Sequence, residues 1–515
     1  MITTNLYRGI KQMLKRNVLY KSFFYASIVL TYFAGLVFYD VTTGLDFQFY
    51  FNTVSFFSDS SFEVFDPGGS LYFSLIAKFL DISLIILDNA SLRTTINITI
   101  QTFNLILFIM GFFGMQRIML TKKISKSNIY LTFSILCFFP PTLYLRLTMK
   151  PEIFAFALLP WIIYSTNQYF QSKRLHHLIL SSFLISLILT SKASITGMVL
   201  LVLAILYFDK LKQDKMRLLR VSLLGTFTSL AILYENYKIF NIWLFEKNLN
   251  IKNFEYASSF SDWDYRAPTS FFYSIDFRNL YENPFKFLHS DSFISITLLD
   301  TLSDYFGFFW NHKEITNLIA FNRVEFTENF LIQNFLPMYI SILFTTVFYF
   351  LSIYIIIFKL DNWKFIAFPF AGIFILALSS LGFPSNNFNP NTGDTFKVHY
   401  YSFLLIVSFV FLISTIIKKL NKIDFLTLLL IPVFLICMGF PKNIDQQYSL
   451  NLENKFNTVF ICNTTNYDNI ECNYEEPELK GIKLDKNKFT TRTPIFSYII
   501  LGSALFLIFR TKEYK

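Results

Sequence analysis

Residues 338–358 read MYISILFTTVFYFLSIYIIIF, a run of 21 residues with no charged side chain. At about 1.5 Å of rise per helical residue, such a run is long enough to cross a hydrocarbon core about 30 Å thick. Residues 22–39 and 400–417 form similar runs. Inside a bilayer every backbone polar group must bond within the protein, and the period-two alternation of a barrel strand is absent from the sequence. These runs therefore predict membrane-spanning helices.

The composition of the whole chain supports the same class. Of its 515 residues, 53% are hydrophobic and 16% are charged, which is more apolar than a soluble protein tolerates. The net charge of +10 comes from short basic clusters between apolar runs, so we expect no nucleic-acid partner. The first apolar run follows about twenty basic and polar residues and lacks a small-residue cleavage site, so an uncleaved span is expected there.

Charge asymmetry between the loops predicts the orientation. Five basic residues precede the first span: Arg8, Lys11, Lys15, Arg16 and Lys21. The following loop, 40–92, holds seven acids and a single basic residue, Lys78. Since basic loops stay in the cytoplasm, this acidic loop is expected outside. With spans that alternate in direction, the later basic clusters also fall on the cytoplasmic side. The sequence therefore predicts an all-α polytopic protein of a bacterial inner membrane, with about twelve spans and both termini in the cytoplasm.

Five regions follow from this topology. They are an N-terminal transmembrane module with the first external loop (1–233), an external segment (234–337), further spans (338–440), a small external segment (441–493), and the last span with a cytoplasmic tail (494–515). Cys462 and Cys472 flank a polar stretch of the small external segment. A disulfide between them is expected on the oxidising side of the membrane, with two free thiols as the alternative.

Three stretches of the first external loop carry a resemblance to a known family. They read GLDFQFY (44–50), VFDP (64–67) and GSLY (69–72). This order resembles the first loop of GT-C glycosyltransferases, membrane enzymes that use polyprenyl-phosphate sugars. The resemblance implies amphipathic helices that lie along the membrane in this loop, and residues 73–87 are suited to form one.

Two further stretches are similar to the same superfamily. PPTLY (140–144) followed by KPE (150–152) resembles the exit of the third span in this superfamily and the acidic residue that opens its fourth span. KVHYY (397–401) resembles a stretch of the superfamily that contains a basic residue and tyrosine near the lipid phosphate. The chain departs from protein O-mannosyltransferases because it lacks a paired Asp-Glu after the first span. It also lacks the Trp-Trp-Asp triplet of oligosaccharyltransferases, which argues against transfer to peptide asparagine.

The chemistry of such a transfer assigns roles to the acids and cations. Inverting transfer requires a carboxylate that takes the proton of the acceptor hydroxyl while the lipid phosphate leaves from the opposite face of the sugar. The resemblance implies that Asp46 is this base and that Asp40 is a second acid that orients the loop. Cations must stabilise the leaving phosphate, and the candidates at predicted external ends are Arg146, Lys150, Lys192, Lys397 and His399. For Lys192 we expect an extension toward lipid headgroups instead.

The expected substrate site contains eight residues: Tyr50, Arg146, Lys150, Glu152, Lys397, His399, Tyr400 and Trp310. Trp310 belongs to an aromatic-rich stretch, 300–312, suited to stacking on sugar rings. The acids of Asp262-Trp263-Asp264 are interpreted as structural, and no metal-ligand spacing of Cys and His is present in the sequence. The sequence leaves the cofactor unknown and a requirement for a divalent cation open. The expected partners are the lipid bilayer, a polyprenyl-phosphate-linked sugar, and an acceptor that is a glycan, a lipid or a protein.

Two other functions compete with this interpretation. An O-antigen polymerase or ligase also has many spans and a large external loop, but it would be expected to rely on arginine-rich external loops. A flippase or transporter of lipid-linked sugars would be expected to carry charges near the middle of paired spans and an internal repeat. The acids of this chain are concentrated in its first external loop, which favours the glycosyltransferase.

Overall fold

The computed structural model describes most of the chain as helices. The described residues are 2–39, 41, 47–58, 68–88, 90–240, 267–282, 284, 289, 292–302, 315–320, 323–326, 328–381, 398–419, 427–437 and 493–510. Within them, strands occur only as a short antiparallel pair, β1 (Ile315–Ala320) and β2 (Arg323–Phe326). The predicted all-α class is therefore confirmed for the part of the chain that is described.

The helices of the N-terminal half are α1 (Ile2–Phe38), α2 (Phe47–Ser58), α3 (Ser70–Ile86), α4 (Leu92–Thr121), α5 (Lys126–Leu136), α6 (Pro140–Leu147), α7 (Glu152–Ser172), α8 (Leu175–Ile188), α9 (Ala193–Gln213) and α10 (Lys215–Phe240). Those of the C-terminal half are α12 (Ser270–Tyr273), α13 (Phe277–Glu282), α14 (Phe293–Asp300), α15 (Glu328–Ile357), α16 (Trp363–Ile366), α17 (Phe368–Ser380), the 3₁₀ turn η5 (Val398–Tyr401), α18 (Ser402–Lys419), α20 (Leu430–Cys437) and α22 (Ile495–Arg510).

Helices long and apolar enough to cross a membrane recur along the described chain. There are seven of them, and α5 with α6, which meet at a bend of 68°, make up to eight. The chain is thus a multi-pass helical membrane protein. Two shorter apolar helices, α8 and α22, are also present, with α22 at the predicted last span, and the count of twelve stays a prediction. The helix α10 continues to Phe240, past the predicted start of the external segment at Tyr234.

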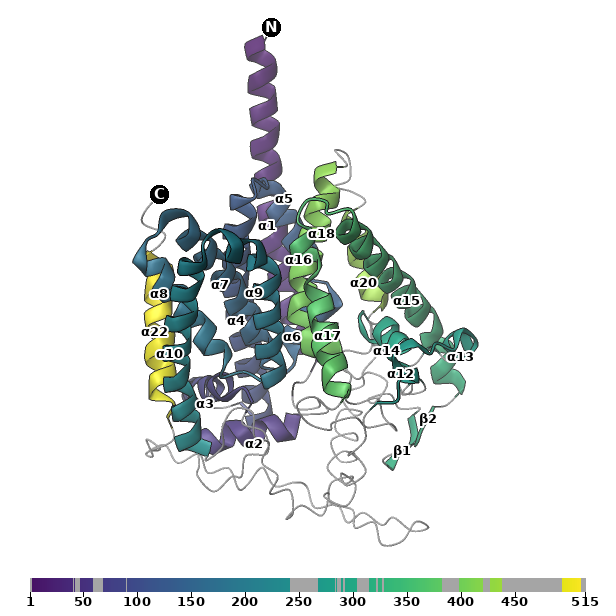
Figure 1. Ribbon diagram of the computed structural model, residues 1–515. Coiled ribbons are helices and arrows are strands. Elements are labelled where there is room, and N and C mark those ends of the chain that lie inside the picture. The colour runs from purple at the N-terminus through teal and green to yellow at the C-terminus, as the bar shows by residue number, and fades with distance from the viewer. Residues whose placement is uncertain are drawn as a thin grey trace.

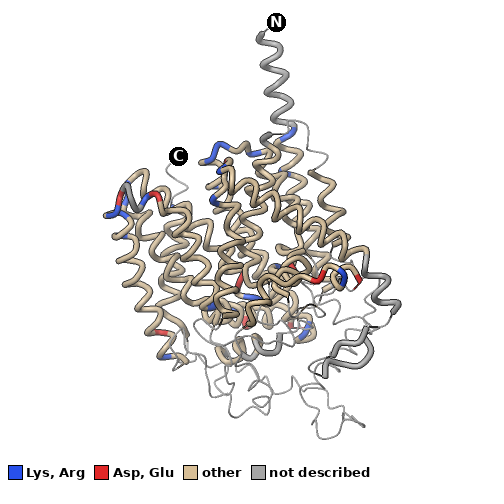
Figure 2. Tube along the Cα trace, turned by 45° about the vertical axis from the view of Figure 1, so that its right-hand side comes forward, with Lys and Arg blue, Asp and Glu red and all other residues tan. Residues whose placement is uncertain are grey.

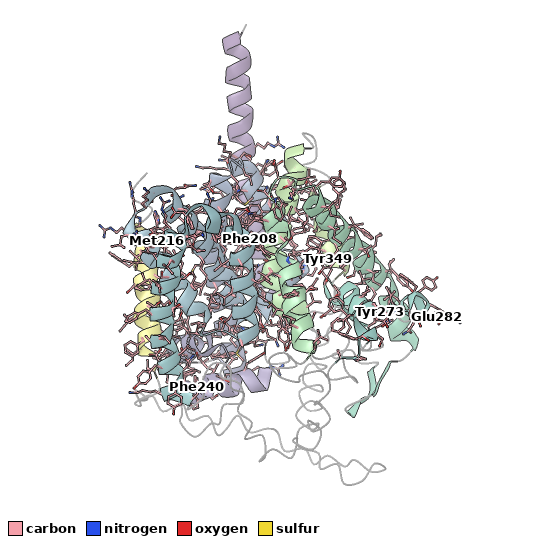
Figure 3. All side chains as sticks on the ribbon, viewed as in Figure 1. Phe208, Met216, Phe240, Tyr273, Glu282 and Tyr349 are labelled. Atoms are coloured by element: carbon pink, nitrogen blue, oxygen red, sulfur yellow. The ribbon has the colours of Figure 1, made fainter. Side chains whose placement is uncertain are left out.

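The outer flank of the helix bundle is apolar. Large hydrophobic side chains are more than half exposed on α9 and α10, such as Phe208 at 58% and Met216 at 59% (Figure 3). Phe227, on α10, is 74% exposed. In water such a surface would be unfavourable, whereas lipid tails solvate it. The flank is therefore the surface that faces the hydrocarbon core.

The centre of the N-terminal half is the pair α4 and α7 (Figure 1). Their backbones approach closely at two glycines. A Cβ on Gly111 would lie 2.5 Å from the Phe156 ring, and one on Gly114 would lie 2.8 Å from Pro160. Trp161 adds a hydrogen bond from its indole N–H to the carbonyl of Met110, at 2.9 Å. Small residues at this crossing permit the close packing that drives helix association in lipid.

The two ends of the bundle differ in what they carry. The start of α1 and the end of α22 lie at one end, and α2 and α3 lie across the spans at the other (Figure 1). Most of the Lys and Arg gather at the end with the termini, beside a few acidic residues, and the opposite end also carries both signs of charge (Figure 2). Helices that lie across the end of a bundle fit the amphipathic helices expected in the first external loop.

A buried carboxylate on α10 accepts hydrogen bonds from the start of the last helix, α22. Glu235, near the end of α10, is 6% exposed. Its Oε1 accepts from the backbone N–H of Phe496 at 2.5 Å, and its Oε2 accepts from the N–H and hydroxyl of Ser497 at 3.0 and 2.6 Å. These N–H groups belong to the first turn of α22, where helices have no internal acceptors. The carboxylate therefore caps α22, and its negative charge interacts favourably with the positive end of the helix dipole.

Replacing Glu235 with Ala is expected to lower the free energy of unfolding by about 1–3 kcal/mol, because buried N–H groups lose a charged acceptor. Denaturant titration in mixed micelles measures the change. Glu282→Ala is the matched control, since Glu282 pairs with Arg278 on a solvent-exposed face, and it should change the stability by less than about 0.5 kcal/mol. Equal stabilities of the two variants would contradict the capping role of Glu235.

Candidate functional site

Five side chains from four separate elements meet at the end of the bundle where α2 and α3 lie. Tyr50 comes from α2, Lys150 and Glu152 from the turn into α7, Lys192 from the turn into α9, and Tyr400 from η5. We call these five residues the Glu152 cluster. The contacts below join all five, although the sequence separates them widely.

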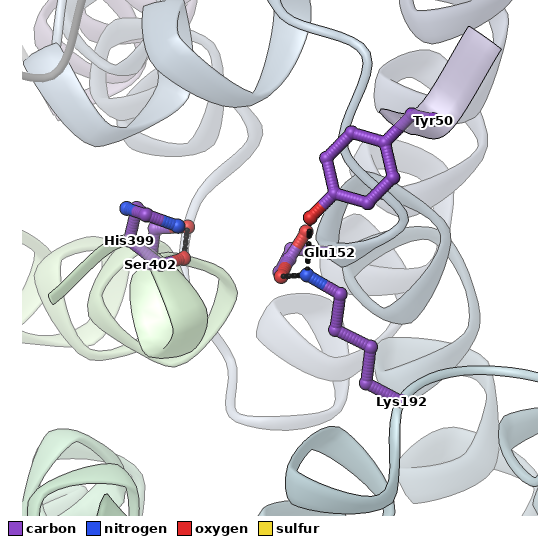
Figure 4. Close-up of polar contacts among 5 residues, drawn as sticks. All are labelled: Tyr50, Glu152, Lys192, His399 and Ser402. Atoms are coloured by element: carbon purple, nitrogen blue, oxygen red, sulfur yellow. Dashed lines mark hydrogen bonds and ion pairs between the residues drawn. The ribbon is translucent and has the colours of Figure 1, made fainter. Parts of the chain in front are cut away.

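Lys192 is the centre of the Glu152 cluster (Figure 4). Its Nζ donates to the phenol oxygen of Tyr50 at 2.6 Å and to Oε1 of Glu152 at 3.3 Å. The side chain of Lys192 is 11% exposed and that of Glu152 is 0% exposed. An ion pair this deeply buried costs desolvation free energy, and removal of one partner leaves an uncompensated charge.

The rings of Tyr50 and Tyr400 contact the two lysines. Nζ of Lys150 lies 4.7 Å from the centroid of the Tyr50 ring, and Nζ of Lys192 lies 5.0 Å from it. Nζ of Lys192 also lies 4.8 Å from the centroid of Tyr400. These are cation–π distances, and such contacts are stronger where water is excluded. The Tyr50 ring thus contacts both ammonium groups.

Local sequence explains why Glu152 lies where it does. Pro151, with φ of −68°, directly precedes the first helical residue of α7, a position that proline suits because the helix needs no N–H there. Glu152 is consequently in the first turn, where the helix dipole favours a negative charge. Its Oε2 is buried and has no hydrogen-bond partner among the described residues.

A polar face of α4 fixes the turn that carries Lys150 and Glu152. Nδ2 of Asn104 donates to the carbonyls of Arg146 and Thr148 at 3.2 and 2.7 Å, and its Oδ1 accepts from the hydroxyl of Tyr72 at 2.9 Å. Burial, followed by the negative charge of Glu152, raises the pKa of Tyr72 well above its ordinary value. The phenol therefore stays protonated and remains a donor to Asn104.

Gly69 links the loop 40–92, predicted to be external, to the same region. Its N–H donates to the carbonyl of Thr190 at 2.9 Å, in the turn that leads to Lys192. Its φ of +93° is a left-handed conformation that favours glycine, and an added Cβ would lie 3.0 Å from Pro151. The turn before α3 therefore packs against both segments that supply the charged residues.

The fourth element, η5, is anchored by an acid of the segment 234–337. Oδ2 of Asp300, at the end of α14, accepts from the N–H of Val398 at 2.9 Å. The His399 ring lies 4.5 Å from that of Tyr400 and 5.1 Å from that of Tyr144, so three rings form a continuous row. In Figure 4, His399 lies beside Ser402, opposite the group formed by Lys192, Glu152 and Tyr50.

Arg146 has a different environment. It is 2% exposed, its Nη1 donates to the hydroxyl of Thr31 at 2.7 Å, and its guanidinium carbon lies 5.3 Å from the centroid of Phe108. These contacts are with α1 and α4, so Arg146 does not join the Glu152 cluster. Its Nε is buried without a hydrogen-bond partner among the described residues.

The residues predicted from the sequence divide into three groups. Tyr50, Lys150, Glu152 and Tyr400 come together, with His399 beside them, while Arg146 lies apart. The remaining predicted residues lie outside the described residues: Asp40, Asp46, Trp310, Lys397, Cys462 and Cys472, as well as Asp262 and Asp264. Their roles stay predictions.

Sequence reasoning missed the part played by Lys192, whose ammonium contacts Glu152 rather than extending toward headgroups. It also missed Asn104 and Asp300. A signal for Asn104 was present, because Asn97, Gln101 and Asn104 follow helical spacing inside an apolar span and so share one polar face. Among the described residues, no group of three or more His, Cys, Asp or Glu side chains is placed to hold a metal ion.

No protein-family model matches this chain, and no curated protein or solved structure matches it either.

Proposed function

We propose that this chain is a membrane glycosyltransferase that moves a hexose or pentose from a polyprenyl-phosphate donor to a glycan, lipid or protein acceptor on the external side of a bacterial inner membrane. One observation carries the proposal. Two lysines, a buried carboxylate and two tyrosine rings converge at the end of the bundle opposite the termini, next to the first loop. Cations beside aromatic rings suit a ligand that joins a phosphate to a sugar.

The charges of the Glu152 cluster fit the leaving group. Lys150 and Lys192 carry two positive charges and Glu152 carries one negative charge, so the three residues together have a surplus of one positive charge. The phosphodiester of a polyprenyl-phosphate sugar carries one negative charge and gains another as the sugar leaves. Fixed ammonium groups in a water-poor site stabilise such developing charge, and this effect is among the largest in enzymes.

The general base in this proposal is Asp46. It directly precedes α2, which begins at Phe47, and Tyr50 in the first turn of that helix contacts Lys192. Its carboxylate would take the proton of the acceptor hydroxyl, and Asp40 would orient the loop. The acceptor oxygen then attacks the anomeric carbon while the bond from that carbon to the phosphate oxygen breaks.

The proposed topology has twelve spans with both termini in the cytoplasm, and cysteine labelling tests it. A cysteine at Ser58, the last residue of α2, is expected to react with an impermeant maleimide in intact cells. A cysteine at Lys123, in the turn after α4, is the matched control and should react only after permeabilisation. The unsubstituted chain measures the background of native thiols. The reverse pattern would overturn the orientation and move the Glu152 cluster to the cytoplasmic side.

The function itself is tested with purified protein in lipid vesicles. Polyprenyl-phosphate mannose, glucose, galactose and arabinose are supplied as donors, and membranes of the source cells supply the acceptors. We expect one of these donors to be consumed, with release of polyprenyl phosphate that depends on the added acceptor. Protein that stays folded but consumes none of the four donors, in either orientation of the vesicles, would contradict the proposal.

A further inference from the structure

The starting point is the unused oxygen of Glu152. The carboxylate is 0% exposed, and only Oε1 has a hydrogen-bond partner among the described residues, the ammonium of Lys192. Oε2 is buried with no described partner. A buried charged oxygen without a partner is costly, and native proteins rarely leave one without a ligand, a water or a functional role.

The chemistry of a group that would satisfy Oε2 is restricted. A carboxylate oxygen accepts hydrogen bonds, so the group must donate, and it must not be an anion because like charges repel. Yet Nζ of Lys192 lies 3.3 Å from Oε1, and Lys150 lies on the same Tyr50 ring, so an anion is favoured close by. A single ligand that binds both Oε2 and the two ammonium groups carries an anionic group and a hydroxyl a few bonds apart. A glycosyl phosphate has this arrangement.

The aromatic row supports the same ligand. Tyr400 faces the ammonium of Lys192 at 4.8 Å, and His399 and Tyr144 continue the row at 4.5 and 5.1 Å. The C–H face of a sugar ring packs on such rings, while its hydroxyls turn to polar groups at the edge. Lys192, which pairs with Glu152, contacts the first ring of this row.

We propose that Glu152 accepts a hydrogen bond from a hydroxyl of the donor sugar through Oε2, while Lys150 and Lys192 bind the phosphate of the same donor. This inference rests on the proposed function and adds the part of the site that recognises the sugar. Glu152 is then a specificity-determining residue, and the base remains Asp46.

Two probes with the same charge separate recognition of the sugar from recognition of the phosphate. The first is a short-chain polyprenyl phosphate bearing the sugar that the wild type binds best among mannose, glucose, galactose and arabinose. The second is the corresponding polyprenyl methyl phosphate, a phosphodiester with the same single negative charge and no sugar. Titration calorimetry of the full chain in detergent gives Kd for both.

Glu152→Gln is expected to raise Kd for the sugar phosphate about tenfold or more, because a charge-assisted hydrogen bond is weakened. The same variant should bind the methyl phosphate as well as the wild type or better, since a negative charge beside the lysines is removed. Lys192→Met should weaken both probes alike. The ratio of Kd for the sugar phosphate to Kd for the methyl phosphate therefore rises about tenfold in Glu152→Gln and stays unchanged in Lys192→Met.

The double variant Glu152→Gln/Lys192→Met covers the case in which Glu152→Gln does not fold, because it removes both members of the buried pair and leaves no uncompensated charge. Its ratio should match that of Glu152→Gln. Equal weakening of both probes by Glu152→Gln would reduce Glu152 to a positioning residue for Lys192 and overturn the inference. A wild type that binds the methyl phosphate but prefers none of the sugars would also overturn it. Failure of the wild type to bind either probe would overturn the proposed function, and the inference with it.

Discussion

Replacing Asp46 with Asn is expected to lower the rate of sugar transfer from a polyprenyl-phosphate donor by about two to four orders of magnitude, the usual contribution of a general base. The substitution keeps the shape of the side chain and removes its basicity. The acceptor hydroxyl would then have to lose its proton to water while the lipid phosphate leaves. Transfer is measured in vesicles with a labelled donor, and the amount of folded protein is expected to match the wild type.

Two other acids of the first external loop provide matched controls. Asp40→Asn should cost less than Asp46→Asn if Asp40 only orients the loop, and Asp59→Asn should cost almost nothing if that carboxylate is simply solvated. All three substitutions remove one negative charge from the same loop, so a general electrostatic effect would affect them alike. Equal activities of the Asp46 and Asp59 variants would exclude Asp46 as the base while leaving the membrane topology untouched.

Replacing Lys192 with Met is expected to lower the transfer rate by about two to three orders of magnitude, the range found when one preorganised donor to a developing negative charge is lost. The ammonium lies 2.6 Å from the oxygen of Tyr50 and 3.3 Å from Oε1 of Glu152, so several neighbours fix its position. The loss should fall mainly on kcat, because the charge on the phosphate grows as the sugar leaves.

The same substitution is expected to lower the free energy of unfolding by about 3–5 kcal/mol, because it leaves the carboxylate of Glu152 buried without its counter-charge. Stability and activity can be separated with Glu152→Gln/Lys192→Met, which should recover most of the stability and none of the activity. Lys78→Met is the control for loss of a lysine in an exposed pair, and it should change the stability by less than about 0.5 kcal/mol. Wild-type activity in Lys192→Met would contradict the assignment of the phosphate site.

Much of the architecture was predictable because the solvent dictates it. In lipid, backbone groups must pair within a helix, so uncharged runs such as 338–358 mark spans without any knowledge of their neighbours. The helices of the structure coincide with these runs. The helix α10 extends past the predicted membrane boundary at Tyr234: residues 234–240 are polar enough to resemble a loop, yet the helix continues through them to Phe240. Polarity sets where the membrane ends, whereas backbone pairing sets where the helix ends.

The candidate site was predicted in part because some of its residues stand in informative local patterns. Lys150-Pro151-Glu152 opens a helix with an acid after a proline, and Tyr50 and Tyr400 lie in stretches at predicted external ends of spans. Lys192 follows a threonine and a serine in a short turn, a pattern shared with ordinary lysines that reach toward headgroups. Nothing local distinguishes a lysine that meets a carboxylate from one that meets water.

The sequence by itself determined that this protein is a multi-pass bundle of helices, because the period and length of apolar runs and the charges between them are local properties. Only the tertiary structure decided which polar side chains meet: Lys192 with Glu152 and Tyr50, Asn104 with the turn after α6, and Glu235 with the start of α22. Each of these contacts joins helices that are distant along the chain. Their partners depend on how helix faces pack, and close-packed faces are set by the shapes of all their side chains together.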